Sequence, residues 1–145
     1  MDDKTLALLI GGAAPAVLFG LTGFLQKFAG QGIAAGPYLI VVGATATLVG
    51  VAITFLEGDK SFTRVGLVSA LAIGALWALG VACTAVAIRH YGGNVSQLVP
   101  LYNMNTLVAV ILGLVLLSEW QTVHPGRILL AAALIVLGGV LASRA

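Results

Sequence analysis

Long apolar runs separated by short polar segments dominate the pattern of this chain. Five runs are present, and each approaches the length of about 20 residues that a helix needs to cross a bilayer. The polar segment EGDKSFTR, residues 57–64, predicts a water-exposed loop between the second run and the third. The pattern therefore predicts five transmembrane helices, at about residues 5–27, 38–56, 65–88, 95–117 and 126–142.

Composition supports lipid as the main solvent. Of the 145 residues, 60% are hydrophobic and 8% are charged, which is far from the usage of soluble domains. The length leaves room for one domain, residues 1–145, and for no second one. The net charge of +2 comes from basic residues that are scattered singly, so no nucleic-acid surface is expected. We expect an all-α membrane protein.

Small residues and helix ends refine this prediction. The first run is too long for the apolar region of a signal peptide, so we expect it to remain in the protein. Gln26 and Lys27 are expected to end the first helix by reaching the interface, with a glycine-rich turn over residues 30–37. Gly12, Ala16 and Gly20 in the first run, and Gly138 and Ala142 in the last, are spaced for close helix packing. Pro100 predicts a short irregular entry turn to the fourth helix.

The fourth run contains a cluster of polar side chains. At about 100° per residue, a regular helix would place Tyr102, Asn103, Asn105 and Thr106 on one broad sector. Amides in hydrocarbon need partners, so this sector must face protein or water rather than lipid. It either ties the fourth helix to its neighbours or lines a cavity near the membrane midplane. Trp77, at the centre of the third run, either fills packing space or lines the same cavity.

Catalytic and metal chemistry is not indicated. The single cysteine, Cys83, has no nearby base or second thiol, and the chain has no Ser-His-Asp arrangement, phosphate-binding glycine loop or metal-ligand cluster. No Asp or Glu falls inside a predicted span, which argues against proton coupling and against a cationic substrate. We therefore expect neither an enzyme nor a protein with a cofactor.

Basic residues are almost evenly divided between the two sides of the membrane. With five helices, the side of the N-terminus would hold Lys4, Lys60, Arg64 and Arg127, and the other side Lys27, Arg89 and Arg144. The excess of Lys and Arg in cytoplasmic loops normally sets orientation, so this balance favours insertion in both directions.

Several short motifs resemble those of the drug/metabolite transporter superfamily, in its repeating unit called the EamA-type domain. Phe19-Gly20 and Lys27 resemble a Trp-Gly pair and the lysine seven residues after its glycine. Nearer the C-terminus, Pro100 matches the family's proline at the start of helix four. Leu117-Ser118-Glu119 resembles the Leu-Gly-Glu signature that closes this helix. Gly126 and Gly138-Gly139-Val140 resemble the glycines of helix five. The chain thus looks like a half-size bacterial or archaeal member. It departs from the family at Phe19, and from the small multidrug resistance branch by having no acidic residue in helix one.

The resemblance implies one half of an inverted-repeat transporter. Most of the superfamily joins two such units in one ten-helix chain, so a single unit calls for an antiparallel homodimer. We expect such a dimer in a prokaryotic cytoplasmic (inner) membrane, moving a small neutral or zwitterionic metabolite. The expected substrate contacts are Tyr102, Asn103, Asn105, Thr106 and Trp77, with Gln26 and Lys27 near one mouth. The alternative is a non-transporting subunit that pairs with another half-unit or has a structural role.

Overall fold

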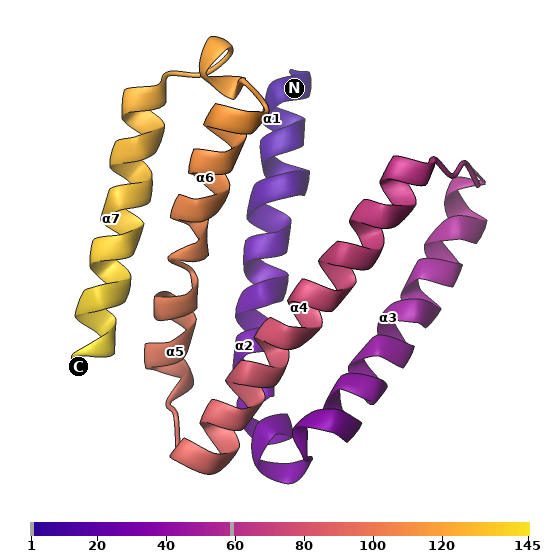
Figure 1. The fold of residues 1–145 in the computed structure, drawn as a ribbon, viewed down its shortest axis with the longest axis vertical. Coiled ribbons are helices and arrows are strands. Elements are labelled where there is room, and N and C mark those ends of the chain that lie inside the picture. The colour runs from indigo at the N-terminus through magenta and orange to yellow at the C-terminus, as the bar shows by residue number, and fades with distance from the viewer. Residues whose placement is uncertain (1, 59) are drawn as a thin grey trace. The chain divides into compact units, whose positions relative to one another are not determined.

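The computed structural model describes residues 2–58 and 60–145 and is all-α over these residues (Figure 1). They form two compact units, residues 1–92 and 93–145. The single domain expected over residues 1–145 stays a prediction. The first unit contains α1 (Asp3–Leu8), the π-helical turn η1 (Leu9–Ala13), α2 (Ala14–Gly32), α3 (Ala35–Glu57) and α4 (Arg64–Tyr91). The second contains α5 (Val95–Tyr102), α6 (Asn105–Leu116), the 3₁₀ turn η2 (Glu119–Gln121) and α7 (Pro125–Ser143).

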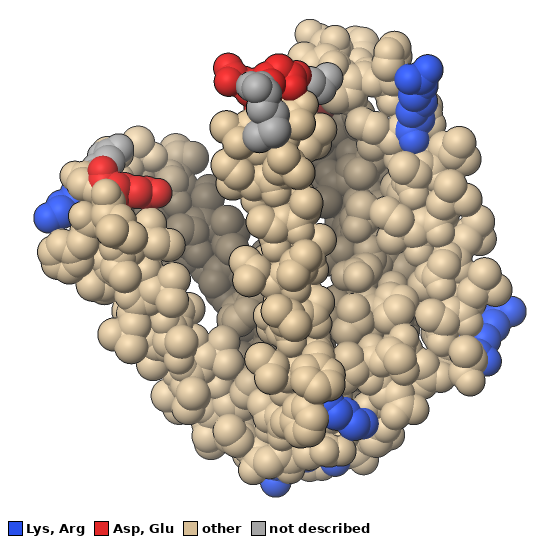
Figure 2. Space-filling model, turned by 180° about the vertical axis from the view of Figure 1, so that it is seen from behind, with Lys and Arg blue, Asp and Glu red and all other residues tan. Residues whose placement is uncertain are grey.

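The predicted five-span, all-α architecture is confirmed. Among the described residues, five helical segments are long and apolar enough to cross a membrane: Thr5–Gly32, Ala35–Glu57, Arg64–Tyr91, Val95–Leu116 and Pro125–Ser143. Most charged side chains lie near helix ends and in turns, and the rest of the surface that faces the viewer is uncharged (Figure 2). The chain is therefore an integral membrane protein by the length and composition of its helices.

The first span differs from its prediction in two ways: it is longer at its C-terminal end, and it contains a π-helical turn near its start. It does not end at Lys27 but continues to Gly32, so Gln26 and Lys27 lie within the helix and the turn shrinks to Ile33 and Ala34. At its start, the Ala14 N–H bonds to the Leu9 carbonyl, five residues back. This wide π turn directly precedes Pro15, whose ring would crowd the carbonyls of a regular helix.

Packing between α2 and α4 explains why the first helix continues. Gly30 is buried, and a Cβ added to it would lie 3.1 Å from Cγ2 of Ile88 on α4, which is itself buried. One residue further along each helix, the Arg89 guanidinium donates to the Gln31 carbonyl over 3.5 Å. The expected contact glycines, Gly12 and Gly20, are instead exposed and meet nothing within 4 Å. The packing position lies at Gly30, further along the helix than the spacing pattern indicated.

The fourth span is broken. The predicted span over residues 95–117 is found at Val95–Leu116, but α5 ends at Tyr102 and α6 begins at Asn105, so it is not one regular helix. The sector derived from a regular helix stays a prediction. Pro100 does not form an irregular entry turn either, because the chain is helical from Val95 onward. Across the break, Met104 N–H bonds to the Leu101 carbonyl at 3.2 Å rather than to Pro100, four residues back, and Thr106 N–H bonds to Asn103 at 3.1 Å. These bonds to carbonyls three residues back satisfy N–H groups of the backbone at the interruption.

Helix α7 packs against both α5 and α6 and approaches the break through a glycine. Gly139 is buried, and a Cβ placed on it would lie 2.6 Å from the Pro100 carbonyl oxygen and 3.1 Å from Cγ of Met104. The expected packing residue, Gly138, is exposed and has nothing within 4 Å. Close approach therefore depends on Gly139, one position after the predicted one.

We predict opposite effects for the two neighbouring glycines. Gly139→Ala forces a methyl group into backbone that cannot move aside cheaply, and should destabilise the protein by about 1–3 kcal/mol. Gly138→Ala, the matched control, should stabilise it by up to about 1 kcal/mol, because alanine favours the helix and meets no neighbour. Thermal unfolding of both variants in the same detergent compares them. Equal stability of the two variants would contradict the packing described for Gly139.

Candidate functional site

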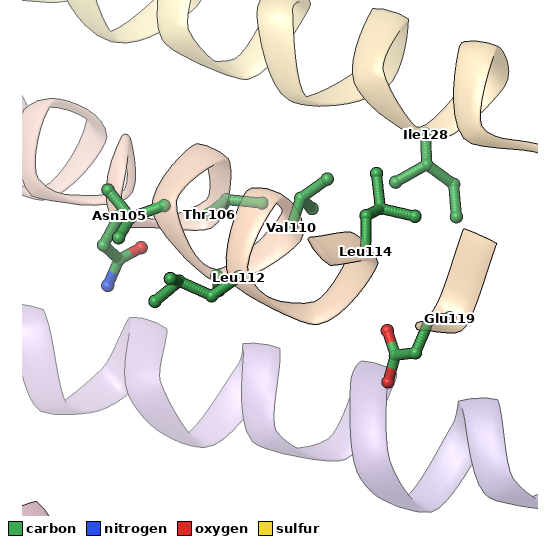
Figure 3. Close-up of a pocket in the computed structure, with 9 residues that line it drawn as sticks. Asn105, Thr106, Val110, Leu112, Leu114, Glu119 and Ile128 are labelled. Atoms are coloured by element: carbon green, nitrogen blue, oxygen red, sulfur yellow. The ribbon is translucent and has the colours of Figure 1, made fainter. Parts of the chain in front are cut away.

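The candidate site is a groove of about 710 Å³ along α6. This volume is in the range of sites for small ligands. Figure 3 shows Asn105 and Glu119 at the two ends of the groove, with apolar side chains between them. Its lining consists of Asn105, Thr106, Val108, Ala109, Val110, Leu112 and Leu114 from α6, Glu119 from η2 and Ile128 from α7.

The break between α5 and α6 positions the first polar end. Asn105 and Thr106 occupy the first turn of α6 because the chain resumes its helix immediately after Met104. Elsewhere in the spans, threonine hydroxyls bond to the carbonyl four residues back, as Thr45 does to Val41 over 2.9 Å and Thr84 to Gly80 over 3.1 Å. Within the described residues Thr106 makes no such bond, since the helix is interrupted behind it. Its hydroxyl and the exposed Asn105 amide can therefore bond to a ligand.

The second polar end is set by a sharp turn after α6. Leu117 N–H bonds to the Gly113 carbonyl at 3.2 Å, and Ser118 then takes the left-handed conformation at φ 56° and ψ 28°. Ser118 is the one non-glycine residue with positive φ in the described chain. This turn reverses the chain and brings the side chain of Glu119 back onto α6.

Gly113 makes the return of Glu119 possible. Gly113 is buried, and a Cβ added to it would lie 2.7 Å from Oε2 and 3.4 Å from Cδ of Glu119. In Figure 3, Asn105, Leu112 and Glu119 extend from the same side of α6, whereas Leu114 points toward Ile128 of α7. The absence of a side chain on Gly113 leaves the carboxylate lying directly against the helix.

Two of the expected substrate contacts line this groove, Asn105 and Thr106. Tyr102, 40% exposed, ends α5, and Asn103 occupies the turn; neither belongs to the lining. The other three expected residues lie in the first unit: Trp77 on α4 is 48% exposed, Gln26 on α2 is buried at 7% exposure, and Lys27 is half-buried.

The sequence reasoning missed Glu119. Glu119 falls outside the predicted spans, and hydrophobic periodicity gives no sign of the turn at Ser118 that redirects its side chain. In residues 2–58 and 60–145, no group of three His, Cys, Asp or Glu side chains could hold a metal ion.

We predict that Ser118→Gly stabilises the protein. A left-handed conformation costs an L-residue with a side chain about 1–2 kcal/mol, and glycine adopts it freely. The gain should therefore be about 1 kcal/mol, measured as a higher midpoint of thermal unfolding. Ser118→Val, with a branched side chain, should lower the midpoint. A loss of stability in Ser118→Gly would contradict the geometry of this turn.

No family model, curated protein or solved structure matches this chain.

Proposed function

We propose that this integral membrane protein is a half-size transporter of the drug/metabolite superfamily. It moves a small neutral or zwitterionic metabolite across a prokaryotic cytoplasmic (inner) membrane, as an antiparallel homodimer. One observation carries the proposal: a groove with free hydrogen-bonding side chains lies within a membrane span, at the point where that span is broken. A span that served only to fill the bilayer would need neither the break nor the groove.

Broken spans are typical of substrate sites in secondary transporters. Interrupted helices bring polar backbone and side chains to the middle of the membrane, where substrates bind. Here α5 covers eight residues before the break, so Asn105 and Thr106 lie well inside the 22-residue span. Their depth favours substrate binding over contact with the interface.

Two local features support the resemblance to the EamA-type unit. Ser118 adopts a backbone conformation that glycine prefers, and it stands where the Leu-Gly-Glu signature has glycine. Gly139, in the stretch that resembles the glycines of helix five, contacts the chain at Pro100, another matching position. Both motif residues thus have a physical reason for their type.

The homodimer rests on charge and exposure. The near balance of Lys and Arg on the two sides favours insertion in both orientations. In addition, at most 11% of the apolar window of any candidate span is buried within the chain. Lipid alone can cover these faces, but an inverted copy would cover them and complete the repeat of a ten-helix transporter.

The alternative is a non-transporting subunit whose groove is filled by a helix of another half-unit. It is favoured by the apolar walls of the groove, Val108, Leu112 and Ile128 among them, which suit a packed helix as well as a small molecule. The two functions differ in whether water enters the groove.

Cysteine labelling separates these functions. In a Cys83→Ala background, Asn105→Cys should react with a water-soluble thiol reagent, because a transport site opens to water. Val115→Cys, which lies outside the groove on an exposed part of α6, should not react when lipid covers it. In intact cells, Ala145→Cys should be labelled in part of the population only, as two orientations require. If Asn105→Cys stays unreactive from both sides of the membrane, the groove is packed with protein and the subunit function holds.

Transport itself is tested with purified protein in proteoliposomes. We expect uptake of at least one compound from a panel of sugars, amino acids and nucleosides, and we expect Asn105→Ala to reduce that uptake at least about tenfold. In an antiparallel homodimer one substitution alters both walls of the site, which makes the loss large. Gly138→Ala serves as the control, with uptake like the wild type. Absence of flux for the whole panel and for long-chain zwitterions such as ω-aminooctanoate would overturn the transporter.

A further inference from the structure

Glu119 is the one formal charge in the lining of the groove, and it lies at the end opposite Asn105. Its carboxylate rests on the Cα face of Gly113, in the last turn of α6. The carbonyls that end a helix carry partial negative charge, so they add to the charge of Glu119 rather than offset it. Glu119 is exposed, and this end of the groove therefore attracts a cation from the surrounding solvent.

A compact ammonium group suits this position. It has three donors, enough for the carboxylate of Glu119 and for carbonyls of the last turn. Arg127, on the first turn of α7, is the nearest Lys or Arg along the sequence, and within the described residues no ion pair joins it to Glu119. The carboxylate thus remains available to a ligand within this unit.

The opposite end provides hydrogen-bond donors. The Asn105 amide and the Thr106 hydroxyl can both donate to a carboxylate or to a carbonyl oxygen. Gly113 follows Asn105 by eight residues, which places the two ends of the groove about 12 Å apart along the helix axis. An α-amino acid is too short to reach both ends, since one whole residue spans about 3.6 Å.

Between the two ends the wall is apolar. Val108, Ala109 and Leu112 follow Asn105 at three, four and seven residues, so they continue its face of α6 toward Glu119. A chain of methylene groups would bury its surface against this stripe. The wall offers no hydrogen bond to a polar chain.

From this arrangement we infer the substrate class: an elongated molecule with a primary ammonium group at one end, an acceptor such as a carboxylate at the other, and an apolar chain between them. The inference rests on the proposed transport function and narrows its neutral or zwitterionic cargo to a long zwitterion. The ammonium group binds Glu119, and the carboxylate binds Asn105 and Thr106.

The test is calorimetric binding to the purified full chain in lipid nanodiscs, with three probes: ω-aminooctanoate, octanoate and glycine. Wild type should bind ω-aminooctanoate at least about tenfold more tightly than octanoate, which lacks the ammonium group, and should not bind glycine measurably. Glu119→Gln should bind the first two probes equally. Equal binding of both by the wild type, or an unchanged preference in Glu119→Gln, would overturn the inference.

A second variant tests whether the position of the Glu119 carboxylate, and not only its charge, determines the preference for ω-aminooctanoate. Gly113→Ala keeps Glu119 but adds a methyl group where its Oε2 lies, so the preference for ω-aminooctanoate over octanoate should fall several-fold. Gly138→Ala should keep the full preference. Thermal unfolding of each variant shows whether it is folded, and a folded Gly113→Ala protein with the full preference would contradict the proposed seat of the ammonium group.

Uptake of the same probes into proteoliposomes distinguishes this inference from the transport function. Uptake of ω-aminooctanoate that Glu119→Gln abolishes supports both. Tight, Glu119-dependent binding without flux of any compound supports the ligand class and overturns the transporter. Flux of sugars or nucleosides that Glu119→Gln leaves unchanged supports the transporter and overturns the ligand class.

Discussion

The need to satisfy every backbone N–H and carbonyl group within hydrocarbon governs this structure. In lipid, no water is present to hydrogen-bond an unpaired backbone group. A span can therefore be interrupted only where other hydrogen bonds or a closely packed neighbour cover the backbone. The fourth span meets this condition between Tyr102 and Asn105, through bonds to carbonyls three residues back. Gly139 also covers the backbone at the interruption, because glycine has no side chain and so lets α7 pack against the Pro100 carbonyl.

The break has a direct consequence for the site. Threonines within regular helix bond their hydroxyls to their own backbone, whereas Thr106, directly after the interruption, makes no such bond within the described residues. At the other end of α6, the turn at Ser118 returns a charged side chain to the helix over Gly113. Two departures from regular helix, one at each end of α6, thus create the two polar ends of one groove.

Function in this protein is argued from these two ends. The apolar wall between them can bury a hydrocarbon chain or a neighbouring helix, and only the polar groups discriminate between such occupants. A carboxylate within the groove also changes the electrostatic picture, because the spans predicted from the sequence contain no acid and indicated an uncharged site. The proposed antiparallel pairing would present the groove twice, in opposite directions across the membrane.

The sequence alone determined the five spans and their approximate ends, because hydrocarbon demands continuous apolar helices and the chain supplies them. It also singled out Asn105 and Thr106, since polar groups in an oily run are conspicuous. Tertiary structure decided the rest: the break two residues wide, the contact at Gly139 rather than Gly138, the extension of α2 to Gly32, and the return of Glu119. Each of these features depends on which residue packs against a given backbone atom. Hydrophobic periodicity predicts which face of a helix is apolar, but not which other element packs against that face.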